Sequence, residues 1–147
     1  MTISISRAGP ADLDALAALF DAYRQFYGQP SDPALARQWL RERLRFGEST
    51  VLLAKRAGST VGFVQLYPMF SSVRTAKTWI LNDLYVDTGA RRQGVARALL
   101  DAAAMFARED GAAGIALETS RDNAAARALY LAAGWQEDAT QWYSLAL

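Results

Sequence analysis

The spacing of apolar residues changes along this chain, and each spacing predicts a different secondary-structure element. Ile3 and Ile5 alternate with serines, which predicts a short strand with one buried face. Apolar residues at three- and four-residue spacing then predict one helix over about residues 12–27 and a second over about residues 33–47. The chain therefore begins with a strand followed by two helices.

The middle of the chain has the pattern of an antiparallel meander, and the rest alternates between strands and helices. Three further strands are expected at about 50–56, 60–69 and 75–86. Beyond them the pattern predicts a helix at 95–108, a strand at 115–119, a helix at 123–133 and strands at 135–137 and 141–147. The order is β-α-α-β-β-β-α-β-α-β-β. It predicts an α/β (α+β) fold with four helices and a mixed, mostly antiparallel sheet of about seven strands.

Length and composition indicate one globular unit. With 147 residues, 52% of them hydrophobic and 21% charged, the chain is expected to form a single domain over residues 1–147. No apolar run approaches the ~20 residues needed to cross a bilayer, and the N-terminus lacks a signal-type apolar stretch. We expect a cytoplasmic protein without a membrane partner.

The absence of two residue types excludes several kinds of chemistry. The chain has no cysteine and no histidine. A disulfide framework, a thiol nucleophile, a Ser-His-Asp triad and a zinc site built on His or Cys are therefore excluded, and no metal is expected. Acid–base work falls to carboxylates, tyrosine, lysine or water. The net charge of +1 argues against a nucleic-acid partner.

One loop has the features of an anion-binding site. Arg91-Arg92-Gln93-Gly94-Val95-Ala96 lies between an apolar strand-like run that ends at Val86 and the helical run that begins at Val95. Unpaired N–H groups and the dipole at a helix start attract anions, and a glycine lets a phosphate approach the main chain. The loop lacks the glycine patterns of nucleoside triphosphate and dinucleotide sites. Its pattern is [Gln/Arg]-x-x-Gly-x-[Gly/Ala].

That loop, the strand before it and the later segment Asn123…Leu129-Tyr130…Gly134-Trp135 together resemble motifs A and B of the GNAT superfamily of acetyl-CoA-dependent N-acetyltransferases. The resemblance covers essentially the whole chain and implies the GNAT fold, with acetyl-CoA as cosubstrate. It implies that the amides of the 93–96 loop face the pyrophosphate and that a bulged fourth strand offers its edge to the pantetheine arm. The donor-binding residues implied in this way are Leu84, Tyr85, Val86, Arg91, Arg92, Gln93, Gly94, Val95, Ala96, Arg97, Asn123, Arg127 and Tyr130.

The resemblance also suggests catalytic roles. Asn82 and Asp83 form a polar pair inside an apolar strand, and many members have a glutamate base at the position of Asn82. Three alternatives stay open: Asp83 acts as base if a bulge turns it round, a water held by Asn82 does so, or the amine binds already neutral. The family's tyrosine, here Tyr130, protonates the departing thiolate. The amide of Leu84 or of a neighbour is expected to stabilise the oxyanion.

The acyl acceptor is expected to be a primary amine of a small molecule, such as an amino acid or small amine. Four aromatic residues are candidates for lining the acceptor pocket: Phe26, Tyr27, Tyr67 and Phe70. The chain looks similar to the branch with yeast-type histone and D-amino-acid acetyltransferases, and more distantly to diamine acetyltransferases, which implies a homodimer. The alternatives are a non-catalytic acyl-CoA-binding module and a protein lysine or N-terminal acetyltransferase.

Overall fold

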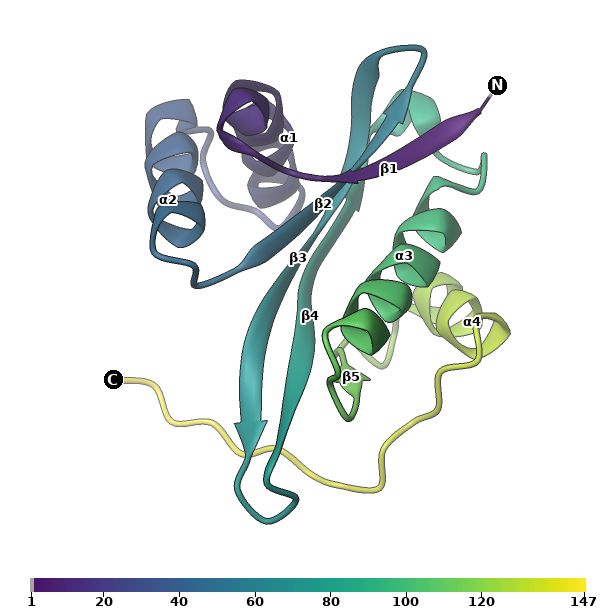
Figure 1. Ribbon diagram of the computed structural model, residues 1–147. Coiled ribbons are helices and arrows are strands. Elements are labelled where there is room, and N and C mark those ends of the chain that lie inside the picture. Colours follow the sequence, from purple (N-terminus) through teal and green to yellow (C-terminus); the bar gives the residue numbers. More distant parts are fainter. Residues whose placement is uncertain (1) are drawn as a thin grey trace.

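The computed structural model describes residues 2–147 (Figure 1). Its helices and strands follow the predicted order as far as the last helix. They are β1 (Ile3–Arg7), η1 (Pro10–Asp12), α1 (Leu13–Phe26), α2 (Pro33–Arg45), β2 (Thr50–Arg56), β3 (Ser59–Ser71), β4 (Ala76–Val86), η2 (Thr88–Ala90), α3 (Val95–Glu109), β5 (Ile115–Ala116) and α4 (Ala124–Ala132), where η marks a short 3-10 turn.

The sheet has the strand order β1-β2-β3-β4-β5. The first four strands are antiparallel neighbours, and β5 runs parallel to β4. Only two residue pairs join β4 to β5, Trp79 with Ile115 and Ile80 with Ala116. The prediction of a mixed, mostly antiparallel sheet is confirmed, and its parallel edge is held by a very short ladder.

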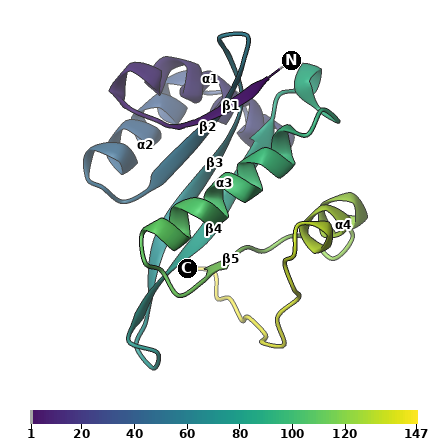
Figure 2. The same ribbon diagram turned by 45° about the vertical axis from the view of Figure 1, so that its right-hand side comes forward.

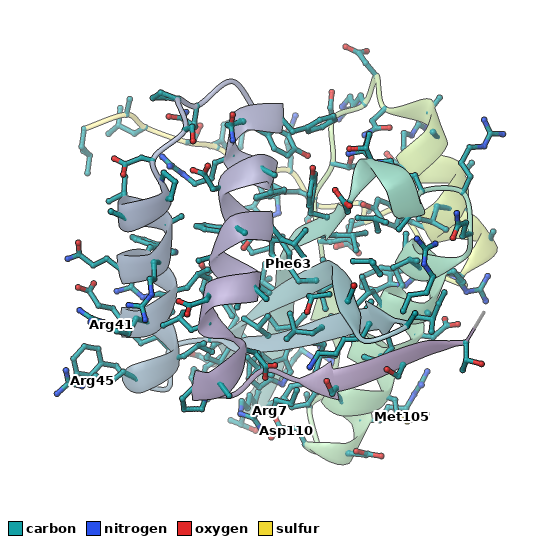
Figure 3. All side chains as sticks on the ribbon, turned by 90° about the horizontal axis from the view of Figure 1, so that it is seen from above. Arg7, Arg41, Arg45, Phe63, Met105 and Asp110 are labelled. Carbon is teal, nitrogen blue, oxygen red and sulfur yellow. The ribbon has the colours of Figure 1, made fainter. Side chains whose placement is uncertain are left out.

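Helices cover both faces of the sheet and enclose two hydrophobic clusters. The helices α1 and α2 lie on one face, and α3 and α4 lie on the other (Figures 1 and 2). Phe63 on β3 is fully buried in the α1–α2 cluster, between helix and sheet in Figure 3, while Leu99 and Leu100 fill the α3 cluster. Arg41, Arg45 and Met105 lie at the periphery of the same view.

Local hydrogen bonds at the helix ends explain why α1 and α2 begin and end where they do. The side chain of Asp32 accepts a hydrogen bond from the Leu35 amide at 3.1 Å and caps α2, with Pro33 in the first turn as predicted. The buried carboxylate of Asp21 accepts from the Ser31 hydroxyl at 2.7 Å and from the Asp32 amide at 2.8 Å. These bonds fix the end of α1 against the start of α2.

A β-bulge in β4 sets which residues face which helices. Asp83 pairs with Gln65 and Leu81 pairs with Leu66, so that Asn82 between them has no partner on β3. An extra residue reverses the side-chain alternation. Leu81 therefore packs toward α3, whereas Asp83 faces the side of the sheet that α1 covers. The bulge expected in this strand lies at Asn82.

The C-terminal part of the predicted sheet differs from the expectation. The strand predicted at 115–119 contains only Ile115–Ala116, and the strands predicted at 135–137 and 141–147 form no ladder, which leaves five strands in residues 2–147 instead of about seven. An alternating sequence makes a strand only where a second strand supplies hydrogen bonds. No strand in residues 2–147 pairs with these segments.

No helix in residues 2–147 is both long enough and apolar enough to span a bilayer.

Candidate active site

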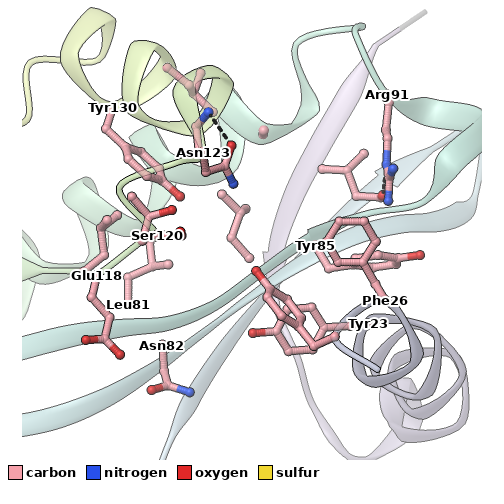
Figure 4. Close-up of a pocket in the computed structure, with 18 residues that line it drawn as sticks. Tyr23, Phe26, Leu81, Asn82, Tyr85, Arg91, Glu118, Ser120, Asn123 and Tyr130 are labelled. Carbon is pink, nitrogen blue, oxygen red and sulfur yellow. Dashed lines mark hydrogen bonds between the residues drawn. The ribbon is translucent and has the colours of Figure 1, made fainter. Parts of the chain in front are cut away.

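A cleft opens where β4 and β5 diverge beyond their two residue pairs. Its volume is about 690 Å³, and α1, β4, the start of α3, the chain after β5 and α4 all contribute to its wall (Figure 4). The lining residues are Tyr23, Phe26, Tyr27, Leu81, Asn82, Leu84, Tyr85, Val86, Arg91, Ala96, Leu117, Glu118, Thr119, Ser120, Asn123, Ala126, Leu129 and Tyr130. The β4 positions predicted to meet the pantetheine arm, Leu84, Tyr85 and Val86, all lie on this wall.

The first turn of α3 presents unpaired backbone donors at one end of the cleft. Gly94 is the N-cap residue with φ of 83°, and no side chain caps the helix. Within residues 2–147, the amides of Gln93, Gly94, Val95, Ala96 and Arg97 have no acceptor. A left-handed backbone at this position is easy only for glycine. Unpaired N–H groups and the helix dipole favour an anion at this position, and binding of the pyrophosphate by these residues stays a prediction.

The three arginines of this region occupy different positions. Arg91 lines the cleft, donates from Nε to the carbonyl oxygen of Val86 at 3.0 Å, and lies over the Phe26 and Tyr85 rings. Arg92 is exposed and has φ of 61°, a conformation that non-glycine residues rarely adopt. Arg97 is bound to both oxygens of the Asp101 carboxylate, at 3.0 and 3.2 Å. Arg92 thus has the least engaged guanidinium of the three.

The helix α4 brings Asn123 and Tyr130 to the opposite wall. Asn123 caps α4 by accepting a hydrogen bond from the Ala126 amide at 3.1 Å, as predicted. Tyr130 is half-buried and points into the cleft (Figure 4). Burial, with a smaller contribution from Tyr27, raises the pKa of Tyr130 above its ordinary value of about 10. The hydroxyl therefore keeps its proton at neutral pH.

Arg127 does not reach the cleft. Its Nη1 atom donates to the carbonyl oxygen of Arg121 at 3.2 Å, so it holds the loop that leads into α4. A contact with the donor stays a prediction for this residue.

A buried polar chain lies behind β4. The Asp83 carboxylate accepts hydrogen bonds from Gln65 Nε2 at 2.7 Å and from Asn82 Nδ2 at 3.1 Å, and the Ser49 hydroxyl donates to Gln65 at 2.9 Å. The Tyr23 hydroxyl lies near the Asp83 carboxylate, and each group affects the pKa of the other. Asp83 is only 5% exposed and does not line the cleft, whereas Asn82 and Tyr23 do.

Burial perturbs both members of the Tyr23–Asp83 pair. It raises the pKa of Asp83 above the ordinary range, and hydrogen bonds from Gln65 and Asn82, together with the nearby Tyr23 hydroxyl, offset only part of the shift. Burial and the nearby negative charge of Asp83 raise the pKa of Tyr23 well above 10. A carboxylate with a raised pKa is a stronger base than an exposed one. Tyr23, which lies near this carboxylate, lines the cleft.

Two residues of the cleft, Tyr23 and Glu118, were missed by sequence reasoning. Tyr23 belongs to the apolar pattern of α1, and nothing local shows that its hydroxyl meets a residue sixty positions later. Glu118 supplies the only carboxylate in the cleft lining and lies just beyond the C-terminal end of β5. Ligands often bind beyond the C-terminal ends of parallel strands, and this rule was the signal available for Glu118.

The four aromatic residues expected around the acceptor are divided between two places. Phe26 and Tyr27 line the cleft, but Tyr67 and Phe70 do not. Phe70 is largely exposed near the end of β3. The guanidinium of Arg91 already occupies a face of the Phe26 ring, at 5.5 Å from its centre.

Among residues 2–147, no group of three or more Asp, Glu, His or Cys side chains is arranged to hold a metal ion.

The cleft between the diverging strands β4 and β5, with a loop of unpaired amides opening α3, has the features of a site for an extended ligand that carries an anionic group. A sequence profile of the acetyltransferase (GNAT) family matches residues 14–135. The chain belongs to this family and is an acetyltransferase, and the predicted GNAT fold is confirmed.

Several relatives are similar over most of their length. An uncharacterized N-acetyltransferase of Bacillus subtilis (strain 168), YhfO, is 43% identical over 136 residues, which cover 92% of this chain and 91% of that protein. A probable acetyltransferase of Haemophilus influenzae is 33% identical over 105 residues, 71% of this chain and 72% of that protein. The crystal structure of a probable acetyltransferase superposes with a TM-score of 0.94 at 44% identity, covering 98% of this chain and 97% of that one.

Proposed function

We propose that this acetyltransferase moves the acetyl group of acetyl-CoA to the primary amine of a small molecule, by direct transfer in a ternary complex. The observation that carries the proposal is one continuous cleft. It joins Ala96 in the first turn of α3, whose amide is unpaired, to Tyr130 and to Tyr23, and Asp83 lies behind Tyr23 outside the cleft. Anion binding, an acid and a base are thus available in one place.

The residues present fit the donor. Unpaired amides at the start of α3 and the exposed Arg92 suit a pyrophosphate, and the strand edge at 84–86 suits the amide groups of an extended arm. When bound, acetyl-CoA supplies the thioester that the amine attacks. The bulge at Asn82 supports a role for neighbouring backbone amides of β4 in stabilising charge on the thioester oxygen.

The protein's own residues supply the two proton transfers. The amine proton passes to the Tyr23 hydroxyl oxygen while the tyrosine proton passes to the Asp83 carboxylate, whose raised pKa suits it to hold that proton. The leaving thiolate takes its proton from the Tyr130 hydroxyl, which stays protonated at neutral pH because burial raises its pKa. Asp83 is therefore proposed as a base that acts through Tyr23 rather than directly.

The charge of the cleft supports a small acceptor. Its lining contains one carboxylate, Glu118, and one guanidinium, Arg91, next to the aromatic rings of Phe26 and Tyr27. A polycation or a basic protein tail is expected to need a cluster of carboxylates. A single amine beside one carboxylate and aromatic walls suits an amino acid or a small amine.

The other parts of the proposal rest on the sequence. A homodimer and a cytoplasmic location follow from the family resemblance and composition, and the low net charge of +1 supports a protein without a nucleic-acid partner.

The test is acetyl-CoA consumption across amino acids, small amines, aminoglycoside-type amines and lysine peptides, followed by variants on the best acceptor. Tyr130→Phe is expected to lower kcat by about 10²-fold or more with little change in the KM for acetyl-CoA. Thiol release without amine acetylation, or activity on peptides alone, would contradict the small-amine proposal.

Two further variants locate the base. Tyr23→Phe is expected to lower kcat and to shift the acidic limb of the pH–rate profile, because it cuts the path to the base Asp83. Glu118→Gln is the matched comparison, since Glu118 is the other carboxylate within reach of the cleft. If Glu118→Gln abolishes activity while Tyr23→Phe does not, the assignment of Asp83 as base is wrong.

A further inference from the structure

A second cavity lies beside the end of β1, away from the cleft described above. Its volume is about 740 Å³, which is typical of small-molecule sites. The end of β1, the starts of α1 and β2, the helix α2, the first part of β4 and the end of α3 all contribute to its wall. The two cavities have no lining residue in common. A ligand in the second cavity would therefore occupy a site of its own.

Five basic side chains line this second cavity. Arg37, Arg41 and Arg45 follow one another at four-residue spacing and therefore form one stripe of α2. Arg7 comes from the end of β1, and Lys77 comes from the start of β4. Figure 3 shows Arg41 and Arg45 projecting from α2, with Arg7 at the lower edge of the same view. The whole chain has a net charge of only +1, so positive charge is concentrated around this cavity.

The acidic side chain of the cavity is already engaged by the protein. Among the described residues that line the cavity, only Asp110 carries a carboxylate. This carboxylate pairs with Lys77 Nζ at 3.0 Å and accepts a hydrogen bond from Trp79 Nε1 at 2.9 Å. The Lys77 ammonium also lies over the Trp79 ring, 4.5 Å from its centre. The Asp110 charge is thus satisfied by Lys77 and Trp79 rather than by the arginines.

Three of the four arginines at the cavity have no carboxylate partner. Arg37 pairs with Asp14 at 2.8 Å, whereas Arg7, Arg41 and Arg45 form no ion pair with any of residues 2–147. Like charges at four-residue spacing destabilise a helix, so the pair Arg41 and Arg45 weakens α2 unless an anion lies beside it. Guanidinium groups match the oxygen pairs of phosphates and carboxylates. The cavity therefore has the charge and the donors of an anion site.

We infer that this cavity binds a small anion with two or more negative charges, of the phosphate or polycarboxylate type. Such an anion would meet guanidinium groups from both α2 and β1, and Leu13 and Leu44 offer apolar surface to its carbon atoms. A nucleic acid would need a basic surface that follows several phosphates, whereas here the charge is confined to one cavity of a nearly neutral chain. The inference does not depend on the proposed function, because the two cavities are separate.

The experiment is isothermal titration calorimetry of the full chain at low salt, with inorganic pyrophosphate and citrate as probes. Saturable binding of at least one probe is expected, and the tighter one identifies the preferred anionic group. Arg41→Gln and Arg45→Gln are each expected to weaken binding about 10-fold or more, with unchanged helical circular dichroism because both side chains are exposed. Arg108→Gln is the matched control: it removes the same charge from an exposed position of α3 outside the cavity, and the affinity is expected to stay unchanged.

Pyrophosphate is also expected to bind the loop that opens α3, and Arg92→Ala separates the two sites. This variant is expected to weaken binding at the loop and to leave binding at the second cavity intact. If Arg92→Ala abolishes all binding while Arg41→Gln changes nothing, the anion belongs to the active site, the inference is wrong and the proposed function stands. No saturable binding of either probe, equal effects of Arg41→Gln and Arg108→Gln, or tighter binding of a single-stranded oligonucleotide than of either probe would each overturn the inference as well.

Discussion

Gly62 is the position where a single methyl group has the clearest expected cost. It lies on β3, opposite Val86 of β4. A Cβ added there would lie 2.9 Å from the carbonyl oxygen of Tyr85 and 3.3 Å from side-chain carbons of Val95 and Leu99. The first of these contacts is with a backbone carbonyl oxygen in β4, which cannot move aside without disturbing the sheet. The absence of a side chain at Gly62 therefore lets the first turn of α3 approach the sheet.

The size of the effect follows from two opposing contributions. Overpacking a tightly filled site costs about 1–3 kcal/mol. Replacing glycine by alanine also lowers the conformational entropy of the unfolded chain, which stabilises the folded protein by about 0.4–1 kcal/mol. We expect Gly62→Ala to lower the free energy of unfolding by about 1–2 kcal/mol, which corresponds to a fall in Tm of about 2–8 °C for a chain of this length. Because Val95 begins α3, the KM for acetyl-CoA is also expected to rise.

The assay is urea unfolding followed by circular dichroism, with thermal unfolding as a second measurement. Gly89→Ala is the matched control, because no atom lies within 4 Å of its added Cβ and its φ is not positive. We expect it to change the free energy of unfolding by less than about 0.5 kcal/mol. Equal stability of Gly62→Ala and the parent protein would refute the close-approach argument.

Three other predictions follow from single contacts. Asn123→Ala is expected to lower the free energy of unfolding by about 1 kcal/mol in thermal unfolding, because the α4 cap is lost. Asn123→Ser is expected to keep most of the stabilisation that the cap provides. Equal losses in the two variants would mean that the cap is not the cause. Arg92→Ala is expected to raise the KM for acetyl-CoA more than Arg97→Ala does in steady-state kinetics, because Arg97 is engaged by Asp101, and the reverse order would contradict this assignment. Burial raises the pKa of Asp83 in the folded state, so its stabilising contribution is complete below the unfolded pKa of about 3.9 and is lost as pH rises through the folded pKa. The parent protein should therefore lose stability relative to Asp83→Asn as pH rises above about 4 in urea unfolding, and a gain would show that the direction is wrong.

The elements that the sequence predicted well are those that local interactions specify. The helix starts at Pro33 and Val95 depend on residues within one turn, and both were placed correctly. The anion-type loop before α3 was equally local, since a glycine and the residues around it define it. The sequence alone excludes whole classes of chemistry, because the chain contains no histidine and no cysteine.

Other features depend on partners distant in the sequence, and only the folded chain reveals them. The bulge at Asn82 reflects a register shift between β3 and β4. This shift turns the Asp83 side chain toward Tyr23. The strand predicted at 141–147 has the right alternation, but no segment among residues 2–147 supplies backbone hydrogen bonds to it. Sequence thus determined which residues favour helix, strand or anion binding, because those preferences are local. Tertiary structure decided which of them meet, because strand register, burial and pKa depend on contacts made across the whole fold.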